Sequence, residues 1–521
     1  MIPSYGKVLK RLSEIKKVEI ERRPLTEKVF QEFEETEHPF FIVRAPTGYG
    51  KTVISFTFAY HSLKDASRYD RVIHVLPMRS IIEDIDKTAK EVLGFSRTKM
   101  MGSSEEFMHL FPLNITTVDT FIWDIIKLNT KKLSAIRRRR EYGYDYLTQA
   151  SILTSLVIFD EAHFVLDNPR MKGVFLEVLK FLSRNRVPVI FLTATLSRGY
   201  IELLKRYDAI SVKTFDVQKE DPFYRRESEK SFDLRLVPGE HIDYVDEGSR
   251  NIIIANTVSR AVEVYRKAKE KGLQNTLLLH GRMTPTHKKK ILETLRFWKN
   301  EKEFLLVTTQ VVEAGVDISS DNLITDLAPA NSLIQRFGRV ARYSEKFGNI
   351  IIVRDVEDWP YERTLLMKTE RVLTERLEDL HPRLPETYQE IIDEVHGKTR
   401  IEAEKGSNLA YKRIVRKALE DPAYRSDSVI KGIERKIRDT SQTFLRDLMI
   451  PLEVEGEVVL LSPSKAYELW TQDGITVLQE DKELENIERW SVYKLAIDIA
   501  LGKKKIVVKY KKEYDHEMGI I

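Results

Sequence analysis

The sequence predicts an α/β protein with two doubly wound parallel-sheet lobes in tandem, followed by a mostly helical C-terminal accessory domain. Across residues 40–215, short apolar runs alternate with amphipathic stretches, which is the pattern of strands joined by crossover helices. The same pattern begins again after a polar stretch at residues 219–230. After about residue 355 the composition changes, and Glu, Lys, Arg and Leu recur at helical spacing.

These changes divide the 521 residues into three expected domains, at residues 1–218, 219–355 and 356–521. The strands expected in the first lobe are residues 41–43, 72–76, 115–117, 156–159 and 189–192. Those expected in the second lobe are residues 251–255, 276–279, 304–308, 323–326 and 349–353. The accessory domain has strand candidates at residues 452–454, 458–461 and 506–510. Lysines at both ends of residues 503–512 are typical of an edge strand.

The composition indicates a soluble, cytoplasmic protein. No apolar run approaches the ~18 residues that a membrane span needs, and the N-terminal residues lack the apolar stretch of a signal peptide. The chain contains no cysteine, which excludes disulfides and cysteine-based metal sites. The lack of cysteine, together with a charged fraction of 32%, favours a thermophilic source. The net charge of +5 is small for this length, so a nucleic-acid-binding surface would have to be a local stripe.

Residues 45–52, Ala-Pro-Thr-Gly-Tyr-Gly-Lys-Thr, predict a loop that binds the phosphates of a nucleotide. They follow the apolar run at residues 39–43 and precede an apolar helical stretch. Gly48 and Gly50 allow backbone N–H groups to face the phosphates, and the N-terminus of the next helix adds its dipole. Lys51 would bridge the β- and γ-phosphates, and the Thr52 hydroxyl would be a magnesium ligand. The competing interpretation is a glycine turn that contains Lys-Thr by chance.

A pair of acids supports the nucleotide interpretation. Asp160 and Glu161 directly follow the buried strand expected at residues 156–159. In open parallel sheets, ligands bind at this carboxyl end of the strands. Asp160 would hold magnesium, and Glu161 would polarise the attacking water. Acids that suit the dipole of a helix N-terminus are a second interpretation, and it is compatible with the first. The sequence therefore predicts a nucleoside triphosphate hydrolase.

Three further segments place polar residues after apolar ones. One expected strand ends in Thr193-Ala194-Thr195, and residues 307–318 read as a strand that ends in a polar loop. Residues 332–342 are expected to form a helix that carries Arg339 and Arg342 on one face. From the second lobe, these arginines would reach a nucleotide held by the first. There they would stabilise charge on the transferring phosphoryl group, an effect worth roughly 10³–10⁵ in rate.

The order of these segments resembles the superfamily 2 helicases: the phosphate loop, then Asp-Glu-Ala-His, Thr-Ala-Thr, Glu-Ala-Gly-Val-Asp, and Gln-Arg-x-Gly-Arg-x-x-Arg. The resemblance covers roughly residues 20–355. It implies RecA-like lobes that use ATP and Mg²⁺. The residues that it implies for catalysis are Lys51, Asp160, Glu161, Gln335, Arg339 and Arg342. Those that it implies for ATP binding are Gln31, Ala45, Pro46, Thr47, Gly48, Tyr49, Gly50, Lys51, Thr52, His163, Gly315 and Asp317, with Thr52 and Asp160 on the metal.

The resemblance also implies movement of a single DNA strand, 3′ to 5′, across both lobes. Thr193, Ala194 and Thr195 would couple hydrolysis to the strand, and the alternative is that the two hydroxyls make only structural hydrogen bonds. The residues implied for contact with DNA are Pro77, Arg79, Thr117, Asp119, Thr257, Thr309 and Gln310. Hydroxyls and backbone N–H groups suit phosphates, which position a strand without reading its sequence.

Within the superfamily, the sequence resembles the CRISPR-associated helicase of type I systems at residues 115–120, 278–283, 308–317 and 335–342. In that family a histidine–aspartate nuclease often precedes the helicase. None of the 11 histidines here is followed by Asp, and only about 40 residues precede the phosphate loop. The resemblance therefore implies a stand-alone helicase subunit of the type I-A kind. Its implied partners are single-stranded DNA, a separate histidine–aspartate nuclease subunit and the RNA-guided surveillance complex.

Other interpretations stay open. The chain could be a DNA-repair or RNA helicase of the same superfamily, or a nucleotide-gated binding subunit that unwinds nothing. The arginines at residues 137–140, with tyrosines after them, suit a single-strand contact, a solvated surface helix or a contact with an acidic partner. His280 and His287 have no metal-ligand partners at a known spacing and are interpreted as ordinary residues.

Overall fold

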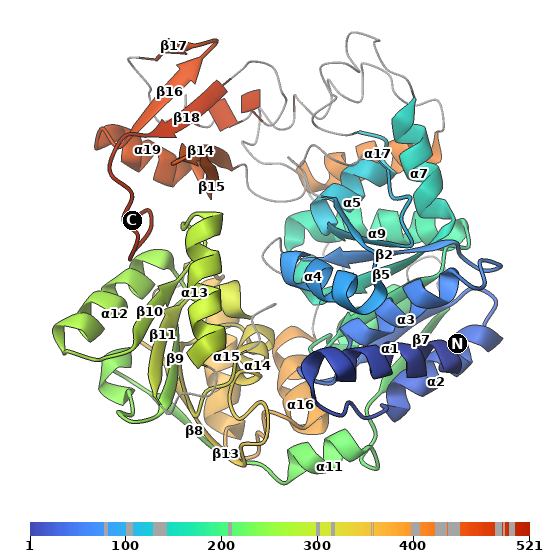
Figure 1. Cartoon of the computed structure of the whole chain (residues 1–521), viewed down its shortest axis with the longest axis horizontal. Coiled ribbons are helices and arrows are strands. Elements are labelled where there is room, and N and C mark those ends of the chain that lie inside the picture. The colour runs from blue at the N-terminus through green and yellow to red at the C-terminus, as the bar shows by residue number, and fades with distance from the viewer. Residues whose placement is uncertain are drawn as a thin grey trace.

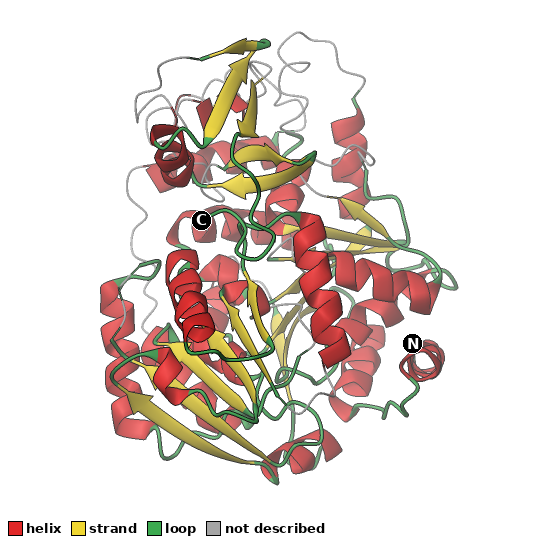
Figure 2. Ribbon diagram, turned by 60° about the vertical axis from the view of Figure 1, so that its left-hand side comes forward, coloured by secondary structure: helices red, strands yellow, loops and turns green. Residues whose placement is uncertain are grey.

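The computed structural model describes most of the chain, and two large sheets and one small sheet organise it (Figures 1 and 2). The described residues are 1–77, 82–99, 108–128, 143–206, 211–298, 303–313, 318–355, 359–397, 407–421, 449–484 and 506–521, with single positions 357, 435, 492, 495, 496, 498 and 499. Within them, every helix is too short or too polar to span a bilayer. The predicted fold class, two parallel-sheet lobes and a further region, is confirmed.

The first lobe is a seven-stranded parallel sheet in the order β3-β4-β2-β5-β6-β1-β7. Its strands are β1 (Phe40–Arg44), β2 (Arg71–Leu76), β3 (Arg97–Lys99), β4 (Leu113–Thr117), β5 (Ser155–Asp160), β6 (Val189–Thr193) and β7 (Val212–Asp216). The helices on one face are α1 (Ile2–Lys16), α2 (Pro24–Glu35), α3 (Thr52–Ser62) and α4 (Ile82–Leu93). Those in the core of the other face include α5 (Val118–Ile125), α7 (Tyr144–Leu153), α8 (His163–Leu166), α9 (Pro169–Arg184) and α10 (Arg198–Arg206). The central strands are nearly continuous apolar runs because helices cover both faces.

The second lobe is a six-stranded parallel sheet in the order β10-β11-β9-β12-β13-β8. Its strands are β8 (Ser231–Val237), β9 (Arg250–Ile254), β10 (Thr276–Leu279), β11 (Phe304–Thr308), β12 (Asn322–Asp326) and β13 (Phe347–Val353). Its helical segments are η3 (His241–Tyr244), α12 (Val258–Glu270), α13 (Pro285–Trp298), η4 (Gln310–Val312) and α14 (Ala330–Phe337). The short helix α11 (Pro222–Ser228) lies on the connection between the two lobes.

All the strands expected in the two lobes are present, but β3, β7 and β8 were not predicted. All three lie at sheet edges. In β7 and β8 most side chains are exposed or half-buried. An edge strand covered on one side needs no continuous apolar run, so it lacks the signal that revealed the central strands.

Helices beyond residue 355 pack against both lobes. The apolar sides of α15 (Arg363–Arg376) and α16 (Pro385–His396) join the core of the second lobe. The next helix, α17 (Ser407–Glu420), packs against α9 of the first lobe. There the Arg416 guanidinium makes two hydrogen bonds, of 2.8 and 2.6 Å, to the buried carboxylate of Glu177.

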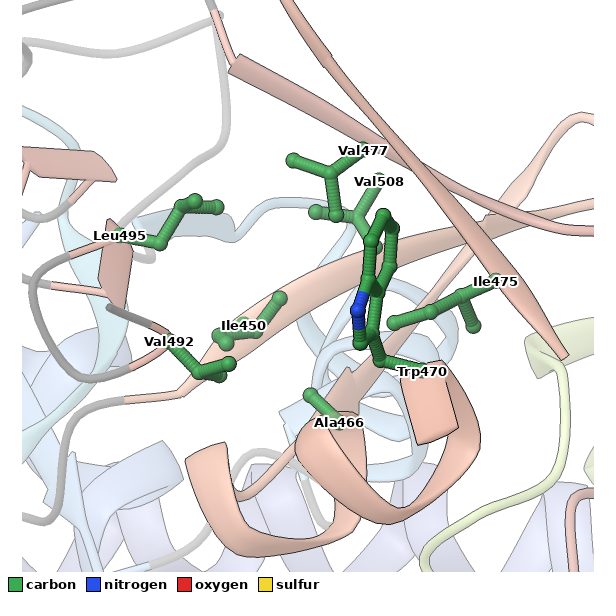
Figure 3. Close-up of a pocket in the computed structure, with 8 residues that line it drawn as sticks. All are labelled: Ile450, Ala466, Trp470, Ile475, Val477, Val492, Leu495 and Val508. Carbon is green, nitrogen blue, oxygen red and sulfur yellow. The ribbon is translucent and has the colours of Figure 1, made fainter. Parts of the chain in front are cut away.

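A small mixed sheet follows, in the order β15-β14-β18-β16-β17. Its elements are β14 (Ile450–Val454), β15 (Glu457–Leu461), α19 (Pro463–Thr471), β16 (Ile475–Gln479), β17 (Lys482–Glu483) and β18 (Ile506–Tyr510). Apolar side chains between α19 and this sheet, Trp470 among them, line a small cavity (Figure 3). The edge position predicted for residues 506–510 is wrong, because β18 pairs with β14 on one side and with β16 on the other.

The C-terminal residues attach the small sheet to the second lobe. The Tyr514 hydroxyl accepts a hydrogen bond of 3.0 Å from Thr284 N and lies 2.8 Å from His287 Nδ1. The imidazole of His280 lies 2.8 Å from the carbonyl oxygen of Met518. Both histidines are therefore held in structural contacts, as ordinary residues would be.

Candidate active site

The predicted phosphate loop joins β1 to α3 at the carboxyl edge of the first sheet. Gly48 and Gly50 have φ of +90° and +97°, which side chains of L-residues rarely tolerate. The loop is tied to a second predicted segment, because Ala45 N donates a hydrogen bond of 3.0 Å to Thr193 O. Thr52 begins α3, so the helix N-terminus faces the loop as the nucleotide interpretation requires.

The predicted lysine and acids lie together at this edge. Lys51 Nζ is 3.0 Å from Glu161 Oε1 and donates a hydrogen bond of 3.1 Å to Ala45 O. Glu161 follows β5 with φ of +49°, and its backbone N–H bonds Leu192 O at 2.7 Å. Lys51, which is expected to bind the phosphates, and Glu161, which is expected to polarise the attacking water, are therefore in direct contact.

Asp160 has the surroundings that a divalent cation would need. One carboxylate oxygen, Oδ2, lies 3.3 Å from Nε2 of the fully buried His74. The other, Oδ1, is buried and has no hydrogen-bond partner among the described residues. An unpaired buried carboxylate oxygen is costly, and a cation would remove that cost. The described residues contain no cluster of three or more acids or histidines that could hold a metal ion by itself. Such a cluster is not required here, because Mg²⁺ bound beside phosphates commonly uses only one or two carboxylates.

His74 was not predicted. It interrupts the apolar run of β2 and lies beside β5, where position 74 pairs with position 158. A polar side chain within an apolar central strand is the signal that could have found it.

His163 connects the two lobes through a buried polar cluster. Its Nδ1 lies 3.3 Å from the hydroxyls of Thr193 and Thr195 and 3.4 Å from Glu161 Oε2. Its Nε2 lies 3.1 Å from Nε2 of Gln335 in the second lobe. Burial lowers the pKa of His163, so the ring is neutral near pH 7 and one ring nitrogen donates while the other accepts.

The arginines of the second lobe differ from the expectation in one respect. We expected a helix through residue 342, but α14 ends at Phe337, and Arg339 and Arg342 lie beyond it. The chain turns away because Val340 forms a β-bridge with Ser320 and Ala341 has φ of +44°. Arg342 N then donates a hydrogen bond of 3.0 Å to the Ser319 hydroxyl.

The second lobe approaches the phosphate loop at the end of α14. A methyl group placed on Gly338 would lie 2.9 Å from Thr47 Cβ, so only glycine fits that approach. The next residue, Arg339, donates a hydrogen bond of 2.7 Å to the carbonyl oxygen of Glu313. Arg339 is therefore adjacent in sequence to a direct contact with the nucleotide-binding loop.

Arg336 and Glu313 form a buried ion pair that the sequence did not reveal. The Arg336 guanidinium is fully buried, and its Nε donates a hydrogen bond of 2.8 Å to Glu313 Oε1. Its other nitrogens donate to Thr325 Oγ1, Asp326 O, Asn256 Oδ1 and the Tyr361 hydroxyl. With these partners inside its own lobe, Arg336 is committed to the core, although it lies within the same motif as Arg339.

Most of the residues predicted to contact DNA lie at the carboxyl ends of strands. Thr117 and Thr257 cap the N-termini of α5 and α12, and Thr309 precedes η4. Pro77 follows β2, and Asp119 lies in the first turn of α5. Gln310 donates a hydrogen bond of 2.7 Å to Asn256 O, which joins two of these loops.

Several predicted residues are placed differently or lie outside the description. Gln31 is exposed on α2, whereas the contact between α2 and the phosphate loop is made by Leu25 N and the Tyr49 hydroxyl, 3.2 Å apart. Arg79, Gly315, Asp317 and residues 137–140 lie outside the described residues.

Tyr49 points away from the nucleotide side of its loop. It is buried, and its hydroxyl donates a hydrogen bond of 2.7 Å to Asp221 Oδ2 on the connection between the lobes. Burial and this carboxylate raise the pKa of Tyr49, so the hydroxyl keeps its proton. If Tyr49 acts in ATP binding, it does so through its backbone.

Replacing Tyr49 with Phe is expected to destabilise the protein by about 1–3 kcal/mol, because a buried carboxylate loses its donor. Urea unfolding of the intact chain measures this change. Tyr60→Phe is the matched control, since Tyr60 is only half-buried. Equal stability of the two variants would show that the bond to Asp221 contributes nothing.

Two family models match the chain. One, described as DEAD/DEAH box helicase, matches residues 23–203. The other, described as CRISPR-associated nuclease/helicase Cas3, C-terminal, matches residues 247–345. The first includes the phosphate loop and the acid pair, and the second includes the arginine segment.

Curated relatives and solved structures agree with these models. The CRISPR-associated helicase Cas3 of Thermoproteus tenax is 26% identical over 64% of this chain and 59% of its own length. The CRISPR-associated nuclease/helicase Cas3 of Methanothermobacter thermautotrophicus is 25% identical over 64% of this chain and 42% of its own. The matched part thus spans about half the length of these relatives. The crystal structure of T. fusca Cas3-AMPPNP matches with a TM-score of 0.57 and 18% identity, over 79% of this chain and 56% of that one.

The fold and the site agree with the first family model, and together they indicate an ATP-hydrolysing helicase of the DEAD/DEAH-box kind. Within that class the chain is similar to the Cas3 helicases, as the second family model and both relatives indicate. The likeness to the solved structure supports the fold, which is what similarity at such low identity can show.

Proposed function

We propose that this chain is an ATP-dependent single-stranded DNA translocase and helicase that moves 3′ to 5′ and opens target DNA for a separate nuclease in type I CRISPR interference. The observation that carries the proposal is the joint placement of Lys51, Glu161 and His163 in one lobe against Gln335 of the other. A nucleotide at this boundary would contact both lobes. Its binding and hydrolysis would therefore change the fit between them.

The residues suit ATP hydrolysis as follows. Lys51 and the loop N–H groups would bind the phosphates, and Thr52 with Asp160 would hold Mg²⁺, which neutralises charge on the β- and γ-phosphates. Glu161 would orient and polarise the attacking water. Arg339 and Arg342 would stabilise the charge of the transferring phosphoryl group from the second lobe.

The Thr193 and Thr195 hydroxyls are suited to couple hydrolysis to movement, because both contact His163, which in turn contacts Gln335. Replacing both threonines with Ala is expected to preserve ATP hydrolysis and to abolish unwinding. The two rates are measured on the same preparation with single-stranded DNA and with a tailed duplex. The double Ser variant, which keeps both hydroxyls, is the control. Equal loss of both activities would contradict the coupling role.

The proposal is tested by the ATP hydrolysis rate of the purified chain alone, with single-stranded DNA, and with single-stranded RNA of the same sequence. The Lys51→Ala variant is the control, because ATP hydrolysis that remains in its preparation comes from contaminating enzymes. Stimulation by DNA alone would support the proposed function, and stimulation by RNA would favour an RNA helicase. No stimulation by either would favour a nucleotide-gated subunit that unwinds nothing.

The partners belong to the proposal as well. The Thermoproteus tenax relative is named a helicase, whereas the Methanothermobacter thermautotrophicus relative is named a nuclease/helicase. A further similar structure is titled as an RNA-guided surveillance complex before nicking. Degradation of target DNA that requires this chain, ATP, a histidine–aspartate nuclease subunit and the surveillance complex together would support the assignment. Degradation that is complete without this chain would contradict it.

A further inference from the structure

The helix α16 lies between the two lobes, although it follows the second lobe in the sequence (Figure 1). Its side chains Tyr388, Ile391, Ile392 and Val395 are buried in the core of the second lobe. In any movement of one lobe against the other, α16 therefore belongs to the second.

The other side of α16 contacts the first lobe. Gln389 Nε2 donates a hydrogen bond of 3.1 Å to Leu196 O, and Asp393 Oδ1 accepts one of 2.6 Å from Arg198 N. Asp393 Oδ2 also lies 3.2 Å from Arg198 Nε. Gln389 and Asp393 are themselves joined by a hydrogen bond of 3.1 Å, so the two side chains hold each other in place.

A close backbone approach follows these polar contacts. A methyl group built on Gly199 would lie 2.7 Å from Gly397 O, at the end of α16. No real side-chain carbon occupies such a position, so the helices α10 and α16 meet at this distance only because residue 199 is glycine.

The contacts fall immediately after the Thr193-Ala194-Thr195 segment. Leu196 is the next residue, and Arg198 begins α10. The carboxylate of Asp393, from one lobe, thus acts as the N-terminal cap of a helix in the other, since it accepts from a backbone N–H in the first turn. Separation of the lobes must break this cap and the bond to Leu196 O.

We propose that Gln389 and Asp393 are positioning residues, which hold the segment after Thr195 when the lobes close and so transmit closure to the coupling threonines. Neither residue is among those that we assign to nucleotide or DNA binding. Their effect would be on the equilibrium between open and closed lobes, because movement of the lobes apart would break these contacts. The role in coupling rests on the proposed function, whereas the role in closure does not.

Lobe closure can be measured directly, because the chain has no cysteine and two introduced ones can be labelled without background. Exposed Lys10 on α1 and Glu270 on α12 are suitable positions for a donor and an acceptor dye. A non-hydrolysable ATP analogue is titrated into the intact chain, and energy transfer reports the fraction closed. DNA-stimulated kcat and KM for ATP are measured on the unlabelled proteins.

The double variant Gln389→Ala, Asp393→Ala is expected to need about 5–30-fold more analogue for half-closure, as for a typical coupling between sites. KM for ATP rises, and the DNA-stimulated kcat falls. Gly199→Ala leaves both polar residues in place and is expected to act in the same direction through the clash with Gly397 O. Because Ala favours helix more than Gly, any weaker closure in that variant cannot come from a less stable α10.

Glu390→Ala is the matched control, because Glu390 lies on the exposed side of α16 and pairs with Arg376 at 3.0 Å. This variant is expected to leave the analogue concentration at half-closure, the midpoint, unchanged. The inference is overturned if the double variant closes at the midpoint of this control, or if the unmutated chain shows no closure with the analogue. A shifted midpoint in a chain that no nucleic acid stimulates would uphold the inference on closure and reject the proposed function.

Discussion

Replacing Arg339 with Ala is expected to lower the DNA-stimulated kcat for ATP hydrolysis by about 10³-fold or more, with ATP binding changed only a few-fold. The reason for this large effect is the position of the Arg339 side chain. The guanidinium is fixed by Glu313 O at 2.7 Å, and the preceding Gly338 touches the phosphate loop at Thr47. A cation held there contributes mainly when charge develops on the transferring group, so kcat falls while binding is preserved.

Steady-state kinetics and equilibrium binding of a fluorescent ATP analogue separate the two effects. Arg339→Lys keeps the charge but lacks the planar guanidinium. Its kcat is expected to lie between that of the unmutated chain and that of Arg339→Ala. Arg376→Ala, on the exposed side of α15, is the control for loss of an arginine. A kcat for Arg339→Ala within tenfold of that control would remove Arg339 from the catalytic set.

Replacing Arg336 with Ala is expected to destabilise the chain by about 3–5 kcal/mol, because it leaves the Glu313 carboxylate buried without its counter-charge. The five hydrogen bonds of the guanidinium to the second lobe are lost at the same time. Urea unfolding measures the change, followed by fluorescence and by circular dichroism so that unfolding of a single lobe is detected.

A second variant distinguishes the buried charge from the lost packing. Arg336→Met with Glu313→Gln removes both charges and is expected to recover a large part of the lost stability. If Arg336→Ala unfolds at the urea concentration of the unmutated chain, the ion pair does not stabilise the lobe. Two arginines three residues apart would then not have the separate roles assigned here.

The central strands and the first-lobe site were predictable because their signals are local. An apolar run followed by Asp160-Glu161, or by a glycine loop with Lys51, specifies both the element and the edge at which it ends. The contact between His163 and Gln335 was not predicted, since nothing local relates residues 172 positions apart.

The parts that were not predicted depend on tertiary contacts. The end of α14 at Phe337 follows from a bridge between Val340 and Ser320, which a periodic pattern through residue 342 cannot show. Glu313 reads as a polar loop residue until Arg336 is found against it in the core. For residues 506–510, the lysines suggested an edge, but β18 lies between β14 and β16, neighbours that are set by pairing with segments distant in the sequence.

Tyr49 makes the phosphate loop and the connection between the lobes parts of one mechanical unit. Its backbone belongs to the loop, while its hydroxyl is bonded to Asp221, which also caps the start of α11. A displacement of the loop and a rotation about the connection are therefore not independent motions. Under the proposed function, a displacement of the loop on ATP binding would reach the connection through the side chains of Tyr49 and Asp221, without passing through the surface where the lobes meet.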